Sequence, residues 1–398
     1  MIPVEEVKAK IDKAFPDIVA AATQWKATAA VASAAVKPYP AERISFKGSY
    51  ADLNKMFFDR KWSLGLPIIP PTPDKVAEML KGTSHKPDEV LWVVPPRQGM
   101  LTVELAAAIG VMAGCKPEHM PLMLAVIEAF KDPDATWRSI TTTTAPTVPI
   151  VIISGPIIDK LGLNPGTGTA GAEQPVTNAL GYFLNLVADV VGGSMPPNWD
   201  KSTHGTSADM VAMVFTENAK GNPWKQTYAE EAGFKPTDSV VTVFGAYLGG
   251  CNVDHNSNTG KSLLNTLSSG ILGNSSGICG CLSDYKGGHQ TEYEKNGVVF
   301  TFLFLCPEHA DTIARDFPTK QAVKDYIVKT AVQPFKFYSP GRCLPPPEFG
   351  PVTEDTLVPR FKSPDSIKLV VTGGAGKQSQ IWAPFPMVVH PVSVLVKD

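Results

Sequence analysis

Residues 239–267 read SVVTVFGAYLGGCNVDHNSNTGKSLLNTL, and this stretch decides the fold class. It opens with an apolar run that is typical of a buried strand, and from Gly260 onward it has the pattern of a helix. Strand patterns lead into helix patterns in the same way at 90–131, 148–193 and 297–331. This alternation predicts an α/β fold with largely parallel sheets.

The chain of 398 residues is too long for one small core, so we expect three segments. These are an N-terminal helical arm with a Pro-rich segment (1–85), a first α/β half (86–235) and a second α/β half (236–398). The residues Cys, Pro, Glu and His occur together at a helix entry twice, in 114–130 and in 305–317, and this repeated pattern favours an internal duplication. The ordinary preference for Pro and Glu in a first helical turn explains the repeated pattern as well.

Charge and cysteine content limit the partners and the compartment. A formal net charge of −2 argues against nucleic acid and anionic membranes as partners. The N-terminus lacks the pattern of a signal peptide, and six dispersed cysteines do not suggest a disulfide scaffold, so we expect a cytoplasmic protein with reduced thiols. The N-terminal helix is expected to pack on a partner subunit in a homo-oligomer.

Gly260, Lys261 and Ser262 raise the question of a phosphate-binding P-loop. The pattern requires glycine where this chain has His255, so a nucleotide-hydrolysing P-loop is not predicted. The amides and dipole at the start of this helix still suit a carboxylate or phosphate of a small substrate. The GTGTAG stretch at 166–171 lies too far past its strand for a dinucleotide fingerprint, and we expect a loop over a site or a connector.

Three cysteines are candidates for a nucleophilic or redox thiol: Cys115, Cys251 and Cys281. Cys115 lies between two helices, close to Glu118, and a thiol at a helix N-terminus often has a lowered pKa. Cys281 belongs to a Cys-Gly-Cys stretch whose spacing is not typical of zinc sites, and we predict no metal site. Buried, unreactive thiols remain the alternative.

Further candidates follow the expected strands. Cys251, Asp254 and His255 come just after an apolar strand, where open α/β sheets place their sites. Arg97 follows another strand and suits a substrate carboxylate. The hydroxyl groups of Thr143 and of Ser154, which ends the apolar run at 148–156, are candidate ligand donors.

Five blocks of the chain, spread in order over nearly its whole length, also resemble a known protein family. They are WSLGLPIIPPTPDKVAEML (62–80), VVPPRQGMLTVELAAAIGVMAGCKPEHMPLMLAVIEA (93–129), TTTTAPTVPIVIISGPIIDKLGLN (141–164), NPWKQTYAEEAGFKPTDSVVTVFGA (222–246) and IKLVVTGGAGKQS (367–379). These blocks resemble the UGSC-like (seleno)protein family, which implies thiol or selenol chemistry. Arg97, Cys115 and Glu118 carry over from them. The naming Cys-Gly-Ser-Cys motif is absent, the nearest stretch being Cys-Gly-Cys at 279–281, and Leu64 replaces the acid of the family's Trp-x-Asp-Gly-Leu-Pro entry.

Together these patterns predict an enzyme, an oxidoreductase or a lyase, that acts on a small anionic organic molecule in a cleft between the two halves. Its thiol would be Cys115, Cys251 or Cys281, with His255 or Glu118 as acid and base. Two alternatives remain open: a lyase or hydratase that moves protons without a covalent thiol step, and a non-catalytic binding protein. The sequence specifies no cofactor.

Overall fold

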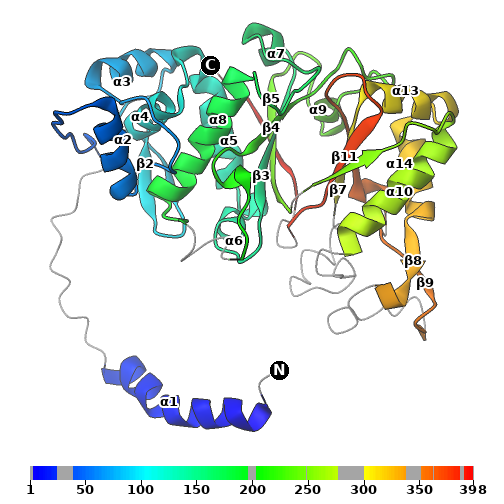
Figure 1. Ribbon diagram of the computed structural model, residues 1–398, viewed down its shortest axis with the longest axis horizontal. Coiled ribbons are helices and arrows are strands. Elements are labelled where there is room, and N and C mark those ends of the chain that lie inside the picture. The colour runs from blue at the N-terminus through cyan, green and yellow to red at the C-terminus, as the bar shows by residue number, and fades with distance from the viewer. Residues whose placement is uncertain are drawn as a thin grey trace.

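The computed structural model describes residues 3–24, 39–195, 203–247, 249–276, 300–337, 351–361, 363–385 and 390–397. Helices and strands alternate over much of this length, which confirms a mixed α/β protein (Figure 1). The helices are α1 (Val4–Gln24), α2 (Tyr50–Asp59), α3 (Pro73–Met79), α4 (Val103–Ala113), α5 (Met120–Lys131), α6 (Trp137–Ile140), α7 (Ile157–Lys160), α8 (Pro175–Leu186), α9 (Tyr228–Glu231), α10 (Gly260–Ser276), α13 (Pro307–Asp316) and α14 (Lys320–Thr330). The strands are β1 (Val90–Val94), β2 (Gly99–Thr102), β3 (Val148–Ser154), β4 (Met213–Thr216), β5 (Val240–Ala246), β6 (Gly250–Val253), β7 (Thr301–Leu305), β8 (Val332–Pro334), β9 (Leu357–Pro359), β10 (Ile367–Val371), β11 (Gln378–Trp382) and β12 (Val392–Leu395).

Local sequence features explain where the main elements begin and end. Every residue of β3 and of β5 is buried, as expected for continuous apolar runs that are covered on both faces. Helix α4 begins after Thr102, whose side chain accepts the amide N–H of Leu105 at 3.2 Å. It ends at Gly114, whose φ of +88° lies in the left-handed region that glycine adopts without strain.

Two four-stranded sheets form the centre of the molecule, with the orders β12-β5-β3-β4 and β10-β7-β11-β6. One pairing in each sheet is parallel, β3 with β4 and β7 with β10, and the other two are antiparallel. The expectation of largely parallel sheets therefore holds for only one pairing in each. The physical reason is that an apolar run indicates burial on both faces, and burial does not specify the direction of the neighbouring strand.

The two sheets share one pairing scheme. A central strand, β3 or β7, lies between a parallel neighbour and an antiparallel neighbour, and a fourth strand pairs with the antiparallel one. The fourth strands are exchanged: β6 follows β5 along the chain but pairs with β11, and β12 follows β11 but pairs with β5. Each sheet thus contributes one edge strand to the other.

The pairing registers agree as well. Two isolated bridges join the ends of the sheets, Glu217 to Thr372 and Ala246 to Pro384. Aligning the two schemes on either bridge places Ser154, the last residue of β3, at the position of Cys306, the first residue after β7. Ser154 and Cys306 therefore occupy equivalent positions at the carboxyl ends of the two central strands.

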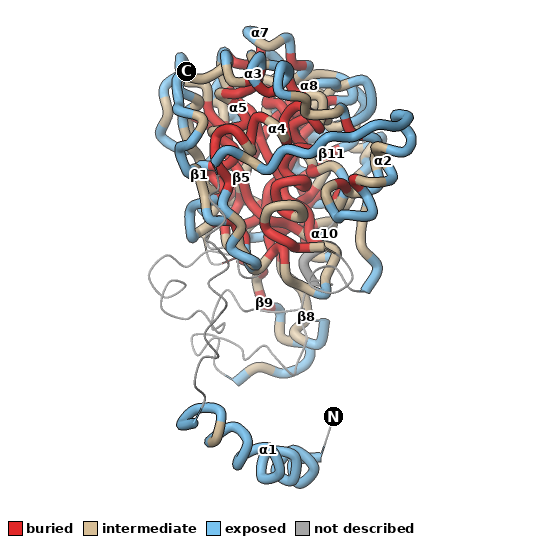
Figure 2. Tube along the Cα trace, turned by 90° about the vertical axis from the view of Figure 1, so that its left-hand side faces the viewer, coloured by how far each residue is buried: buried red, intermediate tan, exposed pale blue. Residues whose placement is uncertain are grey.

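Aromatic side chains pack between the two sheets. Phe244 of β5 stacks on Phe302 of β7 with ring centroids 4.4 Å apart, and Phe215 of β4 meets Phe304 of β7 edge to face at 4.5 Å. All four belong to one buried apolar cluster, which also contains the helices around the first sheet. Figure 2 shows this buried region around β5, α4 and α5.

The predicted segment boundaries do not coincide with the sheets. A boundary at residue 236 assigns β5 and β12 to the second half, yet both pair in the first sheet. In the expected N-terminal segment, α3 packs on α4, whereas α1 has no buried residue and lies apart from the body (Figures 1 and 2). None of the described helices is long and apolar enough to cross a membrane.

Candidate active site

A cysteine and a histidine lie at the junction of β7 and α13. Cys306 is the N-cap of α13, Pro307 takes the first helical position, and His309 lies in the first turn. Both side chains are buried, with 5% of Cys306 and 2% of His309 exposed. The positive end of the helix dipole favours negative charge at the N-cap, so this junction stabilises a thiolate.

The imidazole of His309 is held at both ring nitrogens. Nδ1 lies 2.8 Å from the hydroxyl oxygen of Ser379 on β11, and Nε2 lies 3.2 Å from the carbonyl oxygen of Asp254. Because a carbonyl oxygen only accepts, Nε2 carries a proton and donates it. The hydroxyl of Ser379 also accepts the amide N–H of Cys306 at 3.3 Å. These contacts fix the orientation of the ring.

The thiol and the imidazole shift each other's protonation. Burial by itself would raise the pKa of the Cys306 thiol, but the polar groups and charge of the neighbouring His309 outweigh burial and lower this pKa. Burial would likewise lower the pKa of His309, but the charge of the neighbouring Cys306, together with the carbonyl of Asp254, raises it. Both directions favour a thiolate–imidazolium pair, which places a nucleophile next to an acid.

Glycine-rich loops from distant parts of the chain lie next to this pair. In the β10–β11 loop, the amide of Gly376 donates to Oε2 of Glu308, the residue before His309, at 2.6 Å. A Cβ atom on Gly374 would lie 2.3 Å from Oγ1 of Thr167, so only glycine permits this close approach. Thr167 belongs to the GTGTAG stretch, which the structure therefore places against the β10–β11 loop.

The three predicted cysteines occupy different environments. Cys115 is buried between α4 and α5, and burial raises the pKa of its thiol to about 12, opposite to the direction expected at a helix N-terminus. Cys251 is exposed within the edge strand β6, and its thiol lies 3.7 Å from Oε1 of Gln378. Cys281 lies outside the described residues.

The predicted acid, base and carboxylate-binding residues lie on three separate segments. His255 is exposed after β6, and its carbonyl oxygen accepts a hydrogen bond from Nζ of Lys377 at 3.3 Å. Glu118 is exposed in the short turn that precedes α5. Arg97 is exposed between the antiparallel strands β1 and β2, and its amide donates to the carbonyl of Gly192 at 2.9 Å. Of this group, His255 lies next in sequence to Asp254, whose carbonyl contacts His309.

The start of α10, where a substrate anion was expected, already has intramolecular partners. The amide of Lys261 donates to Oδ2 of Asp316 at 3.2 Å, and the amide of Ser262 donates to Oγ1 of Thr259 at 3.2 Å. Gly260 is buried against the backbone of α13. The helix end therefore contacts the last turn of α13.

The predicted hydroxyl donors lie before and at the end of β3. Thr143 accepts the amide N–H of Ala145 at 3.2 Å. Ser154 is buried, and its hydroxyl donates to Oε2 of Glu217 at 2.7 Å. Burial raises the pKa of the Glu217 carboxyl. By register, this serine and carboxyl occupy in the first sheet the positions of Cys306 and Thr372 in the second.

Sequence patterns did not single out Cys306, His309 or Ser379. The signal for the first two is Cys-Pro-Glu-His directly after an apolar strand, but this repeated pattern was interpreted only as a sign of duplication. Its two copies also lie at different places in the fold, because Cys115 precedes α5 and β3, whereas Cys306 follows β7. Ser379 carries no local signal, since its role depends on the pairing of β11 with β7.

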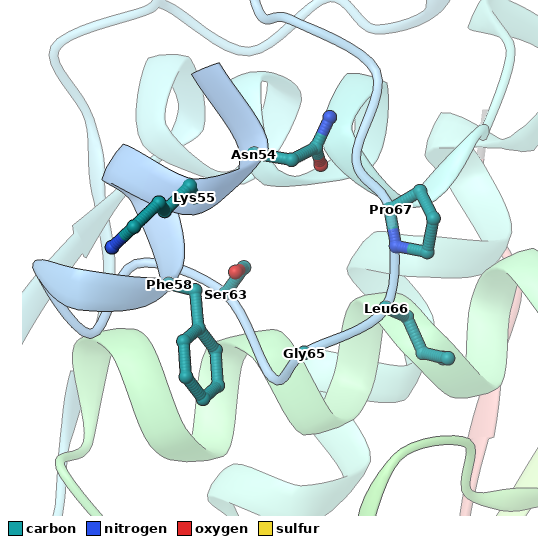
Figure 3. Close-up of a pocket in the computed structure, with 7 residues that line it drawn as sticks. All are labelled: Asn54, Lys55, Phe58, Ser63, Gly65, Leu66 and Pro67. Atoms are coloured by element: carbon teal, nitrogen blue, oxygen red, sulfur yellow. The ribbon is translucent and has the colours of Figure 1, made fainter. Parts of the chain in front are cut away.

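Two cavities lie in the N-terminal part of the body. One, of about 310 Å³, lies between α2 and the loop after it, and is lined by Asn54, Lys55, Phe58, Ser63, Gly65, Leu66 and Pro67 (Figure 3). The other, of about 790 Å³, lies between residues 41–50 and α4, where Glu104 accepts a hydrogen bond from Arg43 at 3.2 Å. Neither is lined by Cys306, His309 or the predicted site residues.

In comparisons with known proteins, no family model, no curated protein and no solved structure matches this chain. Within the described residues, no group of three or more His, Cys, Asp or Glu is arranged to hold a metal ion. The chemistry open to this chain therefore follows from the geometry around Cys306.

Proposed function

We propose that the protein is an enzyme in which the thiolate of Cys306 attacks an electrophilic carbon of a small organic molecule. One observation carries the proposal: a cysteine is the N-cap residue of a helix directly after a central strand, and a histidine in the first turn of that helix is held at both ring nitrogens. Such a pair is the usual arrangement for activating a thiol nucleophile.

In the proposed step, the sulfur electron pair forms a carbon–sulfur bond, and the electron pair of the bond that breaks passes to the leaving group. The imidazolium of His309 gives its proton to that group and becomes neutral, ready to act as a base for the next step. Attack by water on the intermediate would return the thiol. The positive end of α13 supports the expected preference for an anionic substrate.

Among the cysteines that the structure describes, the geometry favours a nucleophilic role over dithiol redox chemistry. In the second sheet β11 separates β7 from β6, so Cys251 lies two strand spacings, about 9.5 Å, from the strand that leads to Cys306. A disulfide requires Cα atoms within about 7 Å. The other cysteine in the described part of the chain, Cys115, lies between α4 and α5.

We also propose that the halves arose by internal duplication, with the site between them. The common strand order, the common register and the exchange of β6 and β12 support this. The resemblance to the UGSC-like proteins implies thiol chemistry, which the proposal assigns to Cys306 rather than Cys115.

Alkylation of the native protein tests the function. Limiting iodoacetamide is applied from pH 5 to 9, and peptide mass spectrometry follows each cysteine. Cys306 and Cys115 are matched controls, because they are similarly buried, at 5% and 8% exposure, while their pKa values shift in opposite directions. We expect Cys306 to react well ahead of Cys115 near neutral pH.

Equal rates at Cys306 and Cys115 would contradict the proposal, because they would show that access alone sets reactivity. If the fast alkylation is lost in Cys306→Ser and kept in Cys251→Ser, Cys306 is the reactive thiol. If it is lost in Cys251→Ser instead, the chemistry belongs to the exposed edge strand.

A further inference from the structure

Asp254 comes from the exchanged part of the chain. It follows β6, the strand that leaves the first sheet and pairs with β11 in the second. Its own amide donates to the carbonyl of Lys377 at 3.3 Å, which continues the pairing one residue past the strand. The exchange thus brings a turn of the chain against His309.

The side chain of Asp254 organises this turn. Oδ1 accepts the amides of Asn256 at 3.1 Å and Ser257 at 2.8 Å, and Oδ2 accepts the hydroxyl of Thr266 on α10 at 2.7 Å. These hydrogen bonds outweigh the effect of burial and lower the pKa of the carboxyl to about 2. The carboxylate therefore stays charged and holds the turn at any pH near neutral.

We propose that Asp254 is a positioning residue for the thiolate–imidazole pair, acting through its backbone carbonyl, while its side chain holds that carbonyl in place. This inference rests on the proposed function of Cys306. A carbonyl oxygen at 3.2 Å from Nε2 fixes the imidazole orientation and favours the doubly protonated ring, as the third member of a catalytic triad does. Here the residue uses its main chain for the ring and its carboxylate for the turn.

The other charged groups near the pair are engaged elsewhere. Glu308, on the same helix, accepts the amide of Gly376. From the β10–β11 loop, Lys377 donates to the carbonyl of His255, itself on the turn after β6. Asp254 is therefore the residue whose charge and carbonyl both act on the imidazole, in agreement with the interactions that raise the pKa of His309.

The test compares Asp254→Asn with Asp316→Asn in the full chain. Both aspartates accept a backbone amide beside α10, Asp254 from Ser257 and Asp316 from Lys261, but the carbonyl of Asp254 alone bonds to His309. The readout is the pH profile of Cys306 alkylation by iodoacetamide. We expect Asp254→Asn to move the profile to higher pH and slow alkylation at pH 6 by about threefold or more. Asp316→Asn should leave the profile unchanged.

Two further measurements keep the inference testable. Thr266→Val removes one hydrogen bond to the carboxylate but keeps its charge, and should shift the profile in the same direction by less than Asp254→Asn. In a Cys306→Ser background, the NMR titration of His309 should show a lower pKa when Asp254 is replaced by Asn.

The outcomes separate the two proposals. If Cys306 is the fast thiol but Asp254→Asn leaves both its profile and the His309 titration unchanged, the positioning role is overturned and the proposed function stands. Equal shifts in Asp254→Asn and Asp316→Asn also overturn the role, because they indicate general loosening around α10. If Cys306 is not the reactive thiol in the unaltered protein, both proposals fail.

Discussion

Replacing His309 by glutamine gives the sharpest test of the site. In the unaltered protein the pKa of Cys306 lies below its ordinary value of 9.0, so at pH 7 about 1% or more of it is thiolate. The pKa of Cys115 is about 12, which leaves a thiolate fraction on the order of 10⁻⁵ at that pH. Thiolate populations thus differ by at least about a thousandfold.

The observable ratio is smaller, because a thiolate of lower pKa is intrinsically less nucleophilic. With the usual dependence on basicity, three pKa units reduce the intrinsic rate about 16- to 32-fold, leaving Cys306 ahead of Cys115 by on the order of 50-fold. Glutamine retains polar atoms of similar reach but carries no charge, so burial is opposed by fewer interactions and the pKa of Cys306 should rise. The ratio should fall by at least about tenfold, toward a few-fold.

The assay is a competition at pH 7 with limiting iodoacetamide, in which the Cys115 peptide of the same molecule is the internal standard. This standard corrects for reagent loss and for general opening of the protein. The sign of the pH dependence is also fixed: the pH of half-maximal alkylation of Cys306 should be higher in His309→Gln than in the unaltered protein. An unchanged ratio in His309→Gln would refute the reasoning, since the imidazole would then have no part in ionising the thiol.

Two predictions concern the framework that positions the site. In α10, Gly270→Ala should destabilise the protein by about 1–3 kcal/mol, because the new Cβ would lie 1.8 Å from Oδ1 of Asn252 on β6. The control is Gly273→Ala in the same helix. Its new Cβ would have no atom within 4 Å, so it should be neutral or stabilise the protein by up to about 1 kcal/mol. Urea midpoints that move equally in both variants would count against the packing of α10 on β6. Glu231→Gln should lower the free energy of unfolding by about 3 kcal/mol, because it leaves Lys320 and Lys324 buried without their carboxylate. The control Asp355→Asn breaks an exposed pair with Lys336 and should change the free energy of unfolding by less than about 1 kcal/mol. Similar urea midpoints for these two variants would show that the two buried ion pairs of Glu231 do not hold α14.

Much of the local structure could be predicted from the sequence. The apolar runs at β3, β5 and β7 gave strands, and the periodic segments gave α5, α10 and α14, because burial of one face or both leaves a direct pattern of residue types. The short strands β4, β6, β11 and β12 were not predicted. Their residues mix polar and apolar types, and pairing with a neighbour, rather than composition, makes them strands.

The candidate site was predictable only in part. The region after the strand at 239–248 was expected to carry functional groups, and Asp254 does contact His309. The reactive thiol was expected at cysteines other than Cys306. A cysteine near a helix start is activated only if its surroundings supply a partner for its charge. Cys115 is buried without one, and its pKa rises, whereas Cys306 has an imidazole beside it.

The sequence by itself determined the mixed α/β class, the buried strands, and the strand-to-helix junction that makes Cys306 an N-cap with His309 one turn on. These are short-range properties, set by residue type, periodicity and helix capping. Only the tertiary structure decided what the junction meets. His309 contacts Asp254 and Ser379, which are 55 and 70 positions away in sequence, because β6 and β11 pair in the second sheet. Strand partners are chosen by backbone hydrogen bonding and by packing of the whole core, and neither leaves a mark within a short stretch of sequence.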